Sequence, residues 1–263
     1  MQRIVTLLSD FGTRDYYVAA VKGVLLSINP ALTLVDISHE IAARNIQEGG
    51  FVLASAFRDF PDGTLHLAVV DPGVGGERRG LAAATDRHFF VGPDNGLFDQ
   101  VFTLDHPRQV VVLENPDYQL HQPCATFHGR DIFAPAVGHL SLGLPLEKLG
   151  SAIDYTTRTR GRLILGDQDE LQGEIIHVDR FGNLISNIEI PSTESQIHLL
   201  DLQVYLGDQQ VLTGPKTYEE APFLRPFALT GSRGNLEVAV RNHSAHKFTG
   251  HGVGTPVLVR RLR

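Results

Sequence analysis

Short apolar runs of strand length alternate with amphipathic stretches over the first 70 residues of the chain. Residues 15–27 and 46–57 place apolar side chains at helical spacing. The apolar runs 4–8, 32–37 and 65–70 lie before, between and after these two stretches. This alternation predicts βαβ units with a mainly parallel sheet, because parallel neighbours need a helical crossover between them.

A polar residue follows each of the three predicted strands, namely Asp10, His39 and Asp71. The carboxyl ends of parallel strands meet at one edge of a sheet, which is where ligands bind in open α/β folds. Asp71 is followed by Pro72 and a glycine-rich stretch, which end the strand, and then by Arg78. An isolated Asp-Pro-Gly fits a solvated turn equally well, and polar segments elsewhere in the chain shift the balance toward a ligand site.

The second half of the chain has a different periodicity. Residues 81–113 contain short strand-like runs, and residues 132–142 have helical spacing. After about residue 165, strand-like runs are separated by turns without long helices, which is typical of an all-β sandwich or barrel. We therefore predict an α/β N-terminal domain with a mainly parallel central sheet and a smaller all-β, barrel-like C-terminal domain. The predicted bounds are 1–160 and 167–263, with a linker at about 156–166 that carries Arg158, Arg160 and Arg162.

Composition and charge narrow the class of protein. The chain has 263 residues, 42% hydrophobic and 20% charged, as in ordinary globular proteins. A formal net charge of −7 disfavours a nucleic-acid surface. No apolar run approaches the roughly 20 residues of a membrane span, and the N-terminus lacks a signal-peptide pattern. We expect a cytoplasmic protein with no membrane partner. Its one cysteine, Cys124, allows no intrachain disulfide and is expected to be a buried structural thiol.

Neither a phosphate-binding loop nor a strong metal motif is present in the sequence. Residues 73–76 are glycine-rich but lack the lysine and the spacing of nucleotide-binding loops. The twelve histidines include His243, His246 and His251, whose gaps permit zinc but lack a helical motif or a cysteine partner. We therefore expect no metal, and a chelator-sensitive hydrolase is the less favoured alternative.

Polar segments also interrupt the predicted strands of the C-terminal domain. Residues 179–183 combine a carboxylate, a ring and an amide, and residues 232–237 and 241–243 flank another strand. Each segment alone fits a hairpin turn as well as a binding loop, because Asn and Gly supply the positive φ angles of turns.

These segments, taken in order, resemble the S-adenosylmethionine hydroxide adenosyltransferases, a family related to the fluorinase and chlorinase enzymes. The matching motifs are Ser-Asp-Phe-Gly-Thr at 9–13, Val-Asp-Pro-Gly-Val-Gly at 70–75, Gly-Pro-Asp-Asn-Gly at 92–96, Phe-His-Gly-Arg-Asp at 127–131, Asp-Arg-Phe-Gly-Asn at 179–183 and Ser-Arg-Gly at 232–234. The resemblance implies an α/β domain followed by a β-barrel, and a homotrimer with sites between the N-terminal domain of one subunit and the C-terminal domain of the next. The implied reaction is S-adenosylmethionine plus water giving adenosine and L-methionine, with no cofactor.

The resemblance also implies roles for individual residues. The catalytic set falls on Asp71, Arg78 and His128, and Asp10 corresponds to the carboxylate that holds the ribose hydroxyls. The other substrate-binding residues are Asp179, Ser232 and Arg233 for the methionine amino and carboxylate ends, Phe181 and Tyr218 for the faces of the adenine, Asn183, Arg241 and Asn242 for its edge, and Phe127, Glu237 and Val240 as further contacts.

Two positions depart from the pattern of the halogenating relatives. Arg44 stands where those relatives have an aromatic residue, and this exchange could alter the wall beside the ribose. Tyr218 replaces a phenylalanine, and it keeps a ring at that position.

The chemistry of the implied reaction is consistent with these residues. The sulfonium makes methionine a neutral leaving group, so the main difficulty is water, whose pKa is near 15.7. We hypothesise that Asp71 and His128 bind this water while Arg78 keeps Asp71 charged; the sequence leaves open which of the two accepts the proton. Halide transfer is the closest alternative, but an ionised Asp71 would repel a halide, and relatives that use fluoride have a serine at Gly129 and another residue at Asp71. A sensor that binds S-adenosylmethionine without turnover is a further alternative.

Overall fold

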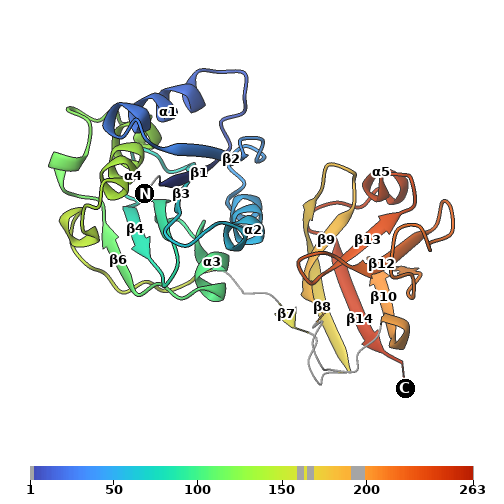
Figure 1. The fold of residues 1–263 in the computed structure, drawn as a ribbon. Coiled ribbons are helices and arrows are strands. Elements are labelled where there is room, and N and C mark those ends of the chain that lie inside the picture. The colour runs from blue at the N-terminus through green and yellow to red at the C-terminus, as the bar shows by residue number, and fades with distance from the viewer. Residues whose placement is uncertain (1–2, 159–162, 165–168, 191–198, 263) are drawn as a thin grey trace. The chain divides into compact units, whose positions relative to one another are not determined.

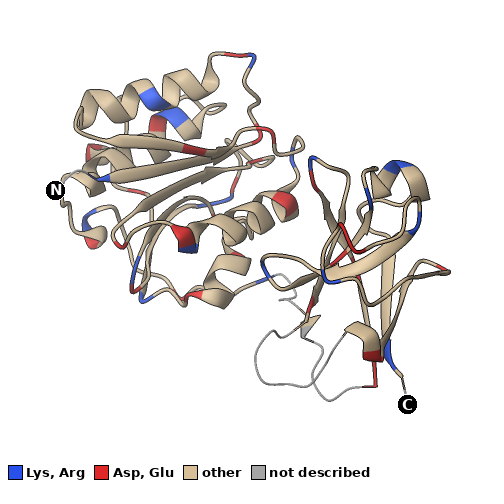
Figure 2. Ribbon diagram, turned by 45° about the vertical axis from the view of Figure 1, so that its right-hand side comes forward, with Lys and Arg blue, Asp and Glu red and all other residues tan. Residues whose placement is uncertain are grey.

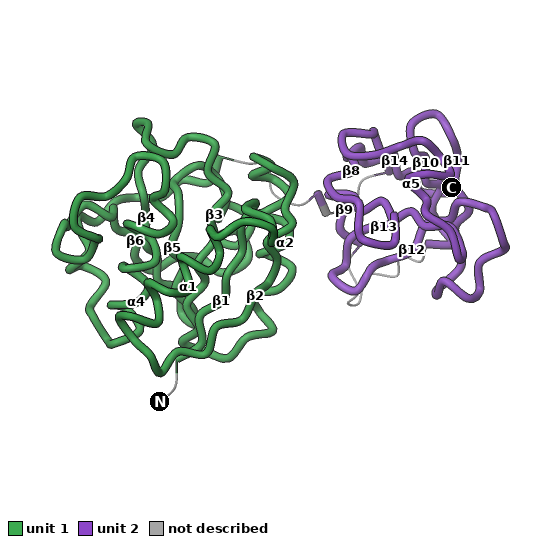
Figure 3. Tube along the Cα trace, turned by 90° about the horizontal axis from the view of Figure 1, so that it is seen from above, with its two compact units in different colours: residues 1–161 green, residues 162–263 purple. Residues whose placement is uncertain are grey.

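The chain folds into two compact units, residues 1–161 and 162–263, shown in different colours in Figure 3. The computed structural model describes residues 3–158, 163–164, 169–190 and 199–262. Much of the predicted linker, including Arg160 and Arg162, lies outside the described residues.

A six-stranded sheet forms the centre of the first unit (Figure 1). Its strands are β1 (Ile4–Ser9), β2 (Thr33–Ser38), β3 (Leu65–Val69), β4 (Gly80–Ala84), β5 (Phe89–Pro93) and β6 (Gln109–Val112). In the order β2-β1-β3-β5-β4-β6, the first three pairings are parallel, and only β4 runs against its neighbours. The prediction of a mainly parallel sheet in a mixed α/β unit is confirmed.

Helices cover both faces of this sheet, because alternate strand residues point to opposite sides. Leu7 and Leu67 share one core cluster with α1 and α4, whereas Leu8 and Ala68 belong to a second cluster with α2 and α3. The helical elements are α1 (Tyr17–Ile28), α2 (Ile46–Ala56), α3 (Asp99–Leu104), a π-helical turn η3 (Gly129–Phe133), α4 (Ala134–Ser141), and the 3-10 turns η1 (Phe57–Asp59), η2 (Pro116–Tyr118) and η4 (Leu146–Lys148). Three of these four α-helices lie at the predicted helical stretches, with small shifts at their ends.

The second unit is a nearly closed sheet in which every long pairing is antiparallel. Its elements are β7 (Leu163–Ile164), β8 (Glu170–Val178), β9 (Leu184–Glu189), η5 (Leu199–Asp201), β10 (Leu202–Leu206), β11 (Gln209–Val211), β12 (Pro226–Thr230), β13 (Asn235–Val240), α5 (Ala245–Thr249) and β14 (Pro256–Arg261). The two ends of the sheet path, β11 and β12, meet where Leu212 donates to the Pro226 carbonyl and accepts from the Ala228 N–H. The short helix α5 was not predicted; Ser244 caps its start and Gly250, at φ 74°, ends it.

Among the described residues, none of the helices has the length and apolar character needed to cross a membrane.

Two buried histidines lie side by side in the core of the first unit. His66 on β3 and His88 before β5 are 0% and 1% exposed, and their ring centroids are 5.0 Å apart. The Thr6 hydroxyl lies 2.7 Å from His66 Nδ1, whereas His66 Nε2 and both His88 nitrogens have no hydrogen-bond partner among the described residues. Burial, reinforced by the charge of His88, lowers the pKa of His66 to about 3.

This burial predicts acid sensitivity of the first unit. The unfolded chain protonates His66 near its ordinary pKa of 6.5 and the folded chain only near 3. Between these values the unfolded state binds one more proton, so the free energy of unfolding falls as pH decreases, by up to about 1.4 kcal/mol per pH unit. His66→Gln removes this titration and retains a partner for Thr6, so urea unfolding between about pH 7 and about pH 4 should depend less on pH.

His121→Gln provides the control, because it makes the same exchange at an exposed position outside the core. An unchanged slope in folded His66→Gln would show that the buried ring is not the source of the acid sensitivity.

Candidate active site

The loop of residues 71–79 connects β3 to β4 at the carboxyl edge of the parallel strands. Ser9 at the end of β1 is in register with Val69 at the end of β3, so Asp10 and Asp71 leave the sheet at the same edge. On the other side of β1, the ring of His39 lies 2.8 Å from the Ser9 hydroxyl, and the Gly12 N–H donates to the His39 carbonyl at 2.7 Å. The sheet therefore brings together the three loops that follow β1, β2 and β3.

Asp71, Arg78 and His128 are joined by hydrogen bonds in this loop region. Arg78 Nε donates to the two Asp71 oxygens at 2.9 and 3.0 Å, and Nη2 donates to Asp71 Oδ2 at 2.5 Å. The same Nη2 lies 2.7 Å from His128 Nδ1. Charged residues of both signs are spread over both units (Figure 2), but the side chains of Asp71 and Arg78 are only 5% and 12% exposed. The guanidinium thus links the carboxylate to the imidazole in a largely desolvated cluster.

The contact with Arg78 fixes the tautomer of His128. A guanidinium only donates hydrogen bonds, so His128 Nδ1 must be the acceptor and its hydrogen resides on Nε2. Burial and the adjacent charge of Arg78 lower the pKa of His128, which favours the neutral ring. The cluster therefore offers carboxylate oxygens as acceptors and the His128 Nε2–H as a donor.

The backbone of the 71–79 loop lies directly against the segment that leads to His128. Gly75 has φ 76°, and a Cβ at this position would be 2.3 Å from the Ala125 carbonyl oxygen. Only glycine fits this close approach without a shift of the backbone. His128 then precedes the π-helical turn, in which Asp131 accepts the Cys124 N–H at 2.7 Å.

The expectation that Cys124 is buried was wrong. Cys124 is exposed, and its Sγ lies 3.2 Å from the Thr126 hydroxyl. Its segment runs over the surface before the chain turns inward at the buried Phe127, so the lack of a thiol-enzyme signature around Cys124 did not mean burial.

Aromatic rings pack together around Phe127, the residue before His128. Phe127 packs edge-on against Phe11 and Tyr17 at 5.8 and 5.2 Å between centroids, and Tyr16 lies 4.6 Å from Tyr17. Tyr16 and Tyr17 were not among the predicted site residues, although two adjacent aromatic residues in the first turn of the predicted helix at 15–27, with Tyr16 63% exposed, are the kind of signal that could have indicated them.

Asp10 is held by the backbone of a strained residue. Its Oδ2 accepts the Arg44 N–H at 2.8 Å, and Arg44 adopts φ 67°, a left-handed conformation that is uncommon for non-glycine residues. The position that departs from the halogenating relatives therefore contacts Asp10 through its main chain.

The remaining predicted site residues lie in the second unit. Asp179 closes the turn between β8 and β9: its Oδ1 accepts the Phe181 and Asn183 N–H groups, and its Oδ2 accepts Asn183 Nδ2. The Phe181 ring on this turn is 77% exposed, whereas Asn183 is buried. Ser232, Arg233 and Asn242 are exposed on nearby loops, and Asn242 has φ 56°.

A second carboxylate, that of Glu237, lies close enough to Asp179 to feel its charge, and it is hydrogen-bonded to Tyr218. The Tyr218 hydroxyl donates to Glu237 Oε2 at 3.3 Å. Burial raises the pKa of Glu237, and the charge of Asp179 raises it further; burial together with Glu237 raises the pKa of Tyr218 to about 12. On the same strand, Val240 is buried, and the Arg241 guanidinium that follows it covers the Phe223 ring at 4.5 Å.

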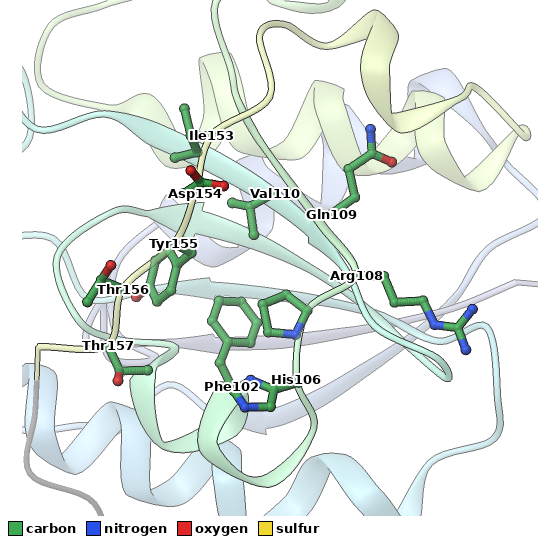
Figure 4. Close-up of a pocket in the computed structure, with 11 residues that line it drawn as sticks. Phe102, His106, Arg108, Gln109, Val110, Ile153, Asp154, Tyr155, Thr156 and Thr157 are labelled. Carbon is green, nitrogen blue, oxygen red and sulfur yellow. The ribbon is translucent and has the colours of Figure 1, made fainter.

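A cavity of about 400 Å³ in the first unit contains none of the predicted site residues (Figure 4). It is lined by Phe102, Tyr155 and the segment 106–110, with the Phe102 and Tyr155 ring centroids 5.0 Å apart. Among the described residues no group of three or more potential metal ligands comes together, so His243, His246 and His251 do not form such a group.

The fold and the cluster define a protein with an α/β unit, a hydrogen-bonded carboxylate, guanidinium and imidazole at the carboxyl edge of its parallel strands, and an all-β unit with polar and aromatic loops. The chain belongs to the S-adenosylmethionine hydroxide adenosyltransferase family: the models of the N-terminal and C-terminal domains of that family match residues 5–150 and 173–258.

Similar proteins cover nearly the full length of the chain. A protein of Thermus thermophilus named (R)-S-adenosyl-L-methionine hydrolase is 40% identical over 262 residues, which cover 97% of this chain and 98% of the relative. A fluorinase of Actinopolyspora mzabensis is 25% identical over 90% of each chain. The crystal structure of an uncharacterized conserved protein from Thermotoga maritima has a TM-score of 0.89 and 31% identity, and covers 98% of this chain and 100% of that one.

Proposed function

We propose that the protein hydrolyses S-adenosyl-L-methionine to adenosine and L-methionine by attack of water on the ribose C5′ carbon. The observation that carries this proposal is the Asp71–Arg78–His128 cluster, a carboxylate and an imidazole held by one guanidinium. Membership of the family and the name of the Thermus thermophilus relative support the substrate.

The positions of the hydrogen atoms in the cluster indicate which residue removes the proton of the water and which residue orients it. As the water oxygen bonds to C5′, the C5′–S bond breaks, and its electron pair stays on sulfur to give neutral methionine. The water must lose a proton, and His128 Nε2 already carries a hydrogen while Nδ1 accepts from Arg78. We therefore assign proton removal to Asp71 and orientation of the water oxygen to His128 Nε2–H.

The second unit supplies a binding region suited to a cation. Asp179 and Glu237 are close enough for the charge of one to raise the pKa of the other. Asp179 already accepts three hydrogen bonds from its own turn, whereas Glu237 accepts a hydrogen bond from the Tyr218 hydroxyl at 3.3 Å. A substrate that carries a sulfonium and an ammonium group relieves the repulsion between two carboxylates, and the exposed Phe181 and Tyr218 rings offer faces for its adenine.

The reaction as proposed uses no metal and no cofactor, because the sulfonium already activates the leaving group. Halide transfer is less well supported. A halide would approach the Asp71 carboxylate, which repels it, and the fluorinase relative is more distant than the relative named as a hydrolase.

Incubation of the purified protein with S-adenosylmethionine, followed by chromatography of the products, tests the function directly. We expect equal amounts of adenosine and methionine, whether or not chloride or a chelator is added. Asp71→Asn, which keeps the shape of the side chain but weakens its basicity, should reduce turnover by about 100-fold or more. A halogenated nucleoside or intact substrate in the wild-type reaction would overturn the proposal, and undiminished turnover in Asp71→Asn would overturn the role of that carboxylate.

The pH dependence of turnover tests the role of His128. A doubly protonated ring cannot accept the Arg78 N–H, so kcat/KM should fall as pH decreases through a pKa below the ordinary histidine value of 6.5. His128→Gln still offers an acceptor and an N–H donor but does not titrate in this range. It should therefore retain part of the activity and lose this acidic limb. The same acidic limb in the wild type and in His128→Gln would show that a group other than His128 causes it.

We further propose that three copies assemble so that the first unit of one copy and the second unit of the next build each site. The division of the predicted site residues between the two units and the family membership support this assembly. Co-expression of Asp71→Asn with Arg233→Ala tests it, because mixed assemblies should restore wild-type residues at about a quarter of the sites. Sites built within single chains would remain inactive in every mixture, and sedimentation would show whether the variants still assemble.

A further inference from the structure

The Gly-Pro-Asp-Asn-Gly motif at 92–96 has no role in the proposed reaction, yet it contacts both ends of the loop that carries Asp71 and Arg78. The loop begins after Val70 and ends before Gly80, where β4 pairs with β5, and Gly80 is in register with Pro93. The motif therefore lies beside the two ends of the loop, where the chain leaves and re-enters the sheet.

Asn95 holds the beginning of the loop. Its Nδ2 donates to the Val70 carbonyl oxygen at 2.8 Å, and its Oδ1 accepts the Leu97 N–H at 3.2 Å. Val70 is fully buried, so its carbonyl oxygen has little access to water as an alternative partner. Asp71 is the next residue along the chain.

Asp94 holds the end of the loop. Its backbone N–H donates to the Arg79 carbonyl at 2.9 Å, and its Oδ2 accepts Arg79 Nε and Nη2 at 3.0 and 2.7 Å. Its Oδ1 accepts Arg158 Nη2 at 2.8 Å, so both oxygens of a carboxylate that is only 2% exposed are bonded to arginine. Arg78 immediately precedes Arg79.

The carboxylate of Asp94 is itself anchored to the body of the first unit. Arg158 also donates its backbone N–H to Asp99 Oδ2 at 2.6 Å, and the Tyr155 hydroxyl donates to Asp99 Oδ1 at 2.5 Å. Asp99 is fully buried at the start of α3. These contacts join Arg158, and through it Asp94, to the buried start of α3.

We propose that Asp94 and Asn95 are positioning residues that clamp the two ends of the 71–79 loop and so keep Asp71 and Arg78 in hydrogen-bonding register. The interior of this loop contains Gly73, Gly75 and Gly76 and would sample many conformations without such restraints. Asp71 follows the clamped Val70 and Arg78 precedes the clamped Arg79, so a small increase in the distance between the two ends of the loop would separate the carboxylate from the guanidinium. The inference rests on the proposed function, in which displacement of a reacting group by about 1 Å can reduce turnover by about 100-fold.

Asn95→Asp tests the clamp with little change of volume. A carboxylate oxygen in place of Nδ2 would face the Val70 carbonyl oxygen, so the bond becomes a repulsion. We expect kcat to fall by about 10- to 100-fold with KM changed by less than about threefold, because the loop positions the water rather than the adenosyl or methionine groups.

Asn115 provides a matched control. Its Nδ2 donates to the Lys148 carbonyl at 2.8 Å and its Oδ1 accepts the Asp117 N–H at 3.0 Å, the same two bonds as those of Asn95 but at an exposed turn outside the site. Asn115→Asp should leave kcat, KM and the titration of His128 at their wild-type values.

Titration of the His128 ring by NMR, without substrate, separates this inference from the proposed function. The charge of Arg78 lowers the pKa of His128, so a loosened loop in Asn95→Asp should move that pKa upward, toward 6.5. This readout remains informative even if the wild-type protein does not hydrolyse S-adenosylmethionine.

Arg79→Lys is the second variant, because Arg79 is half exposed and a lysine keeps the charge but not the forked contact with Asp94. It should change kcat and the His128 titration in the same directions as Asn95→Asp, to a smaller extent. Folded variants with wild-type kcat and a wild-type His128 titration would overturn the clamp.

Discussion

The contact on which the site depends is the desolvated ion pair between Asp71 and Arg78. Taking two charges out of water is costly, and the cost is offset only when the geometry is good and the remaining donors are satisfied. Here the guanidinium uses Nε and Nη2 on the carboxylate and the same Nη2 on His128, and its Cζ atom lies 5.4 Å from the centroid of the Phe133 ring. Loss of either charge would leave the other largely buried without an opposite charge beside it, so neither residue can be replaced independently of the other.

The strand order of the sheet explains how a few residues can hold Asp71 and Arg78 in contact. The parallel strands deliver the loops after β1, β2 and β3 to one edge, and the single antiparallel strand β4 returns the 71–79 loop beside β5. That return places the Gly-Pro-Asp-Asn-Gly motif next to both ends of the loop. In the proposed clamp, strand pairing and a buried carboxylate restrain the two ends of the loop, whereas the loop itself is rich in glycine.

The pattern of apolar residues was sufficient to predict where most strands and helices lie. It was not sufficient to predict the direction of each strand or the contacts between residues distant in the sequence. Apolar runs identified the strands, but they carry no information on direction; β4 is antiparallel because the four-residue turn at 85–88 joins it to β5, and so short a turn cannot make a parallel crossover. The helix α5 has five residues, too few for a periodic signal. Family resemblance supplied Asp71, Arg78 and His128 as a set, and the structure brings them into contact across 50 residues of sequence. The contact of Asn95 with Val70 spans 25 residues and has no local signature, so only a structure could reveal it.

The arrangement of donors and acceptors also bears on why water, rather than a halide, suits this scaffold. A halide needs donors and no base, whereas the first unit presents carboxylate oxygens beside one imidazole N–H. In the proposed reaction the contact from Arg78 to His128 Nδ1 is central to this preference, because it directs the ring hydrogen to Nε2 and leaves proton removal to Asp71. Removal of that carboxylate would leave a guanidinium and an imidazole N–H, a set of donors without a base. The choice of nucleophile therefore depends on one carboxylate and on the arginine that holds it in place.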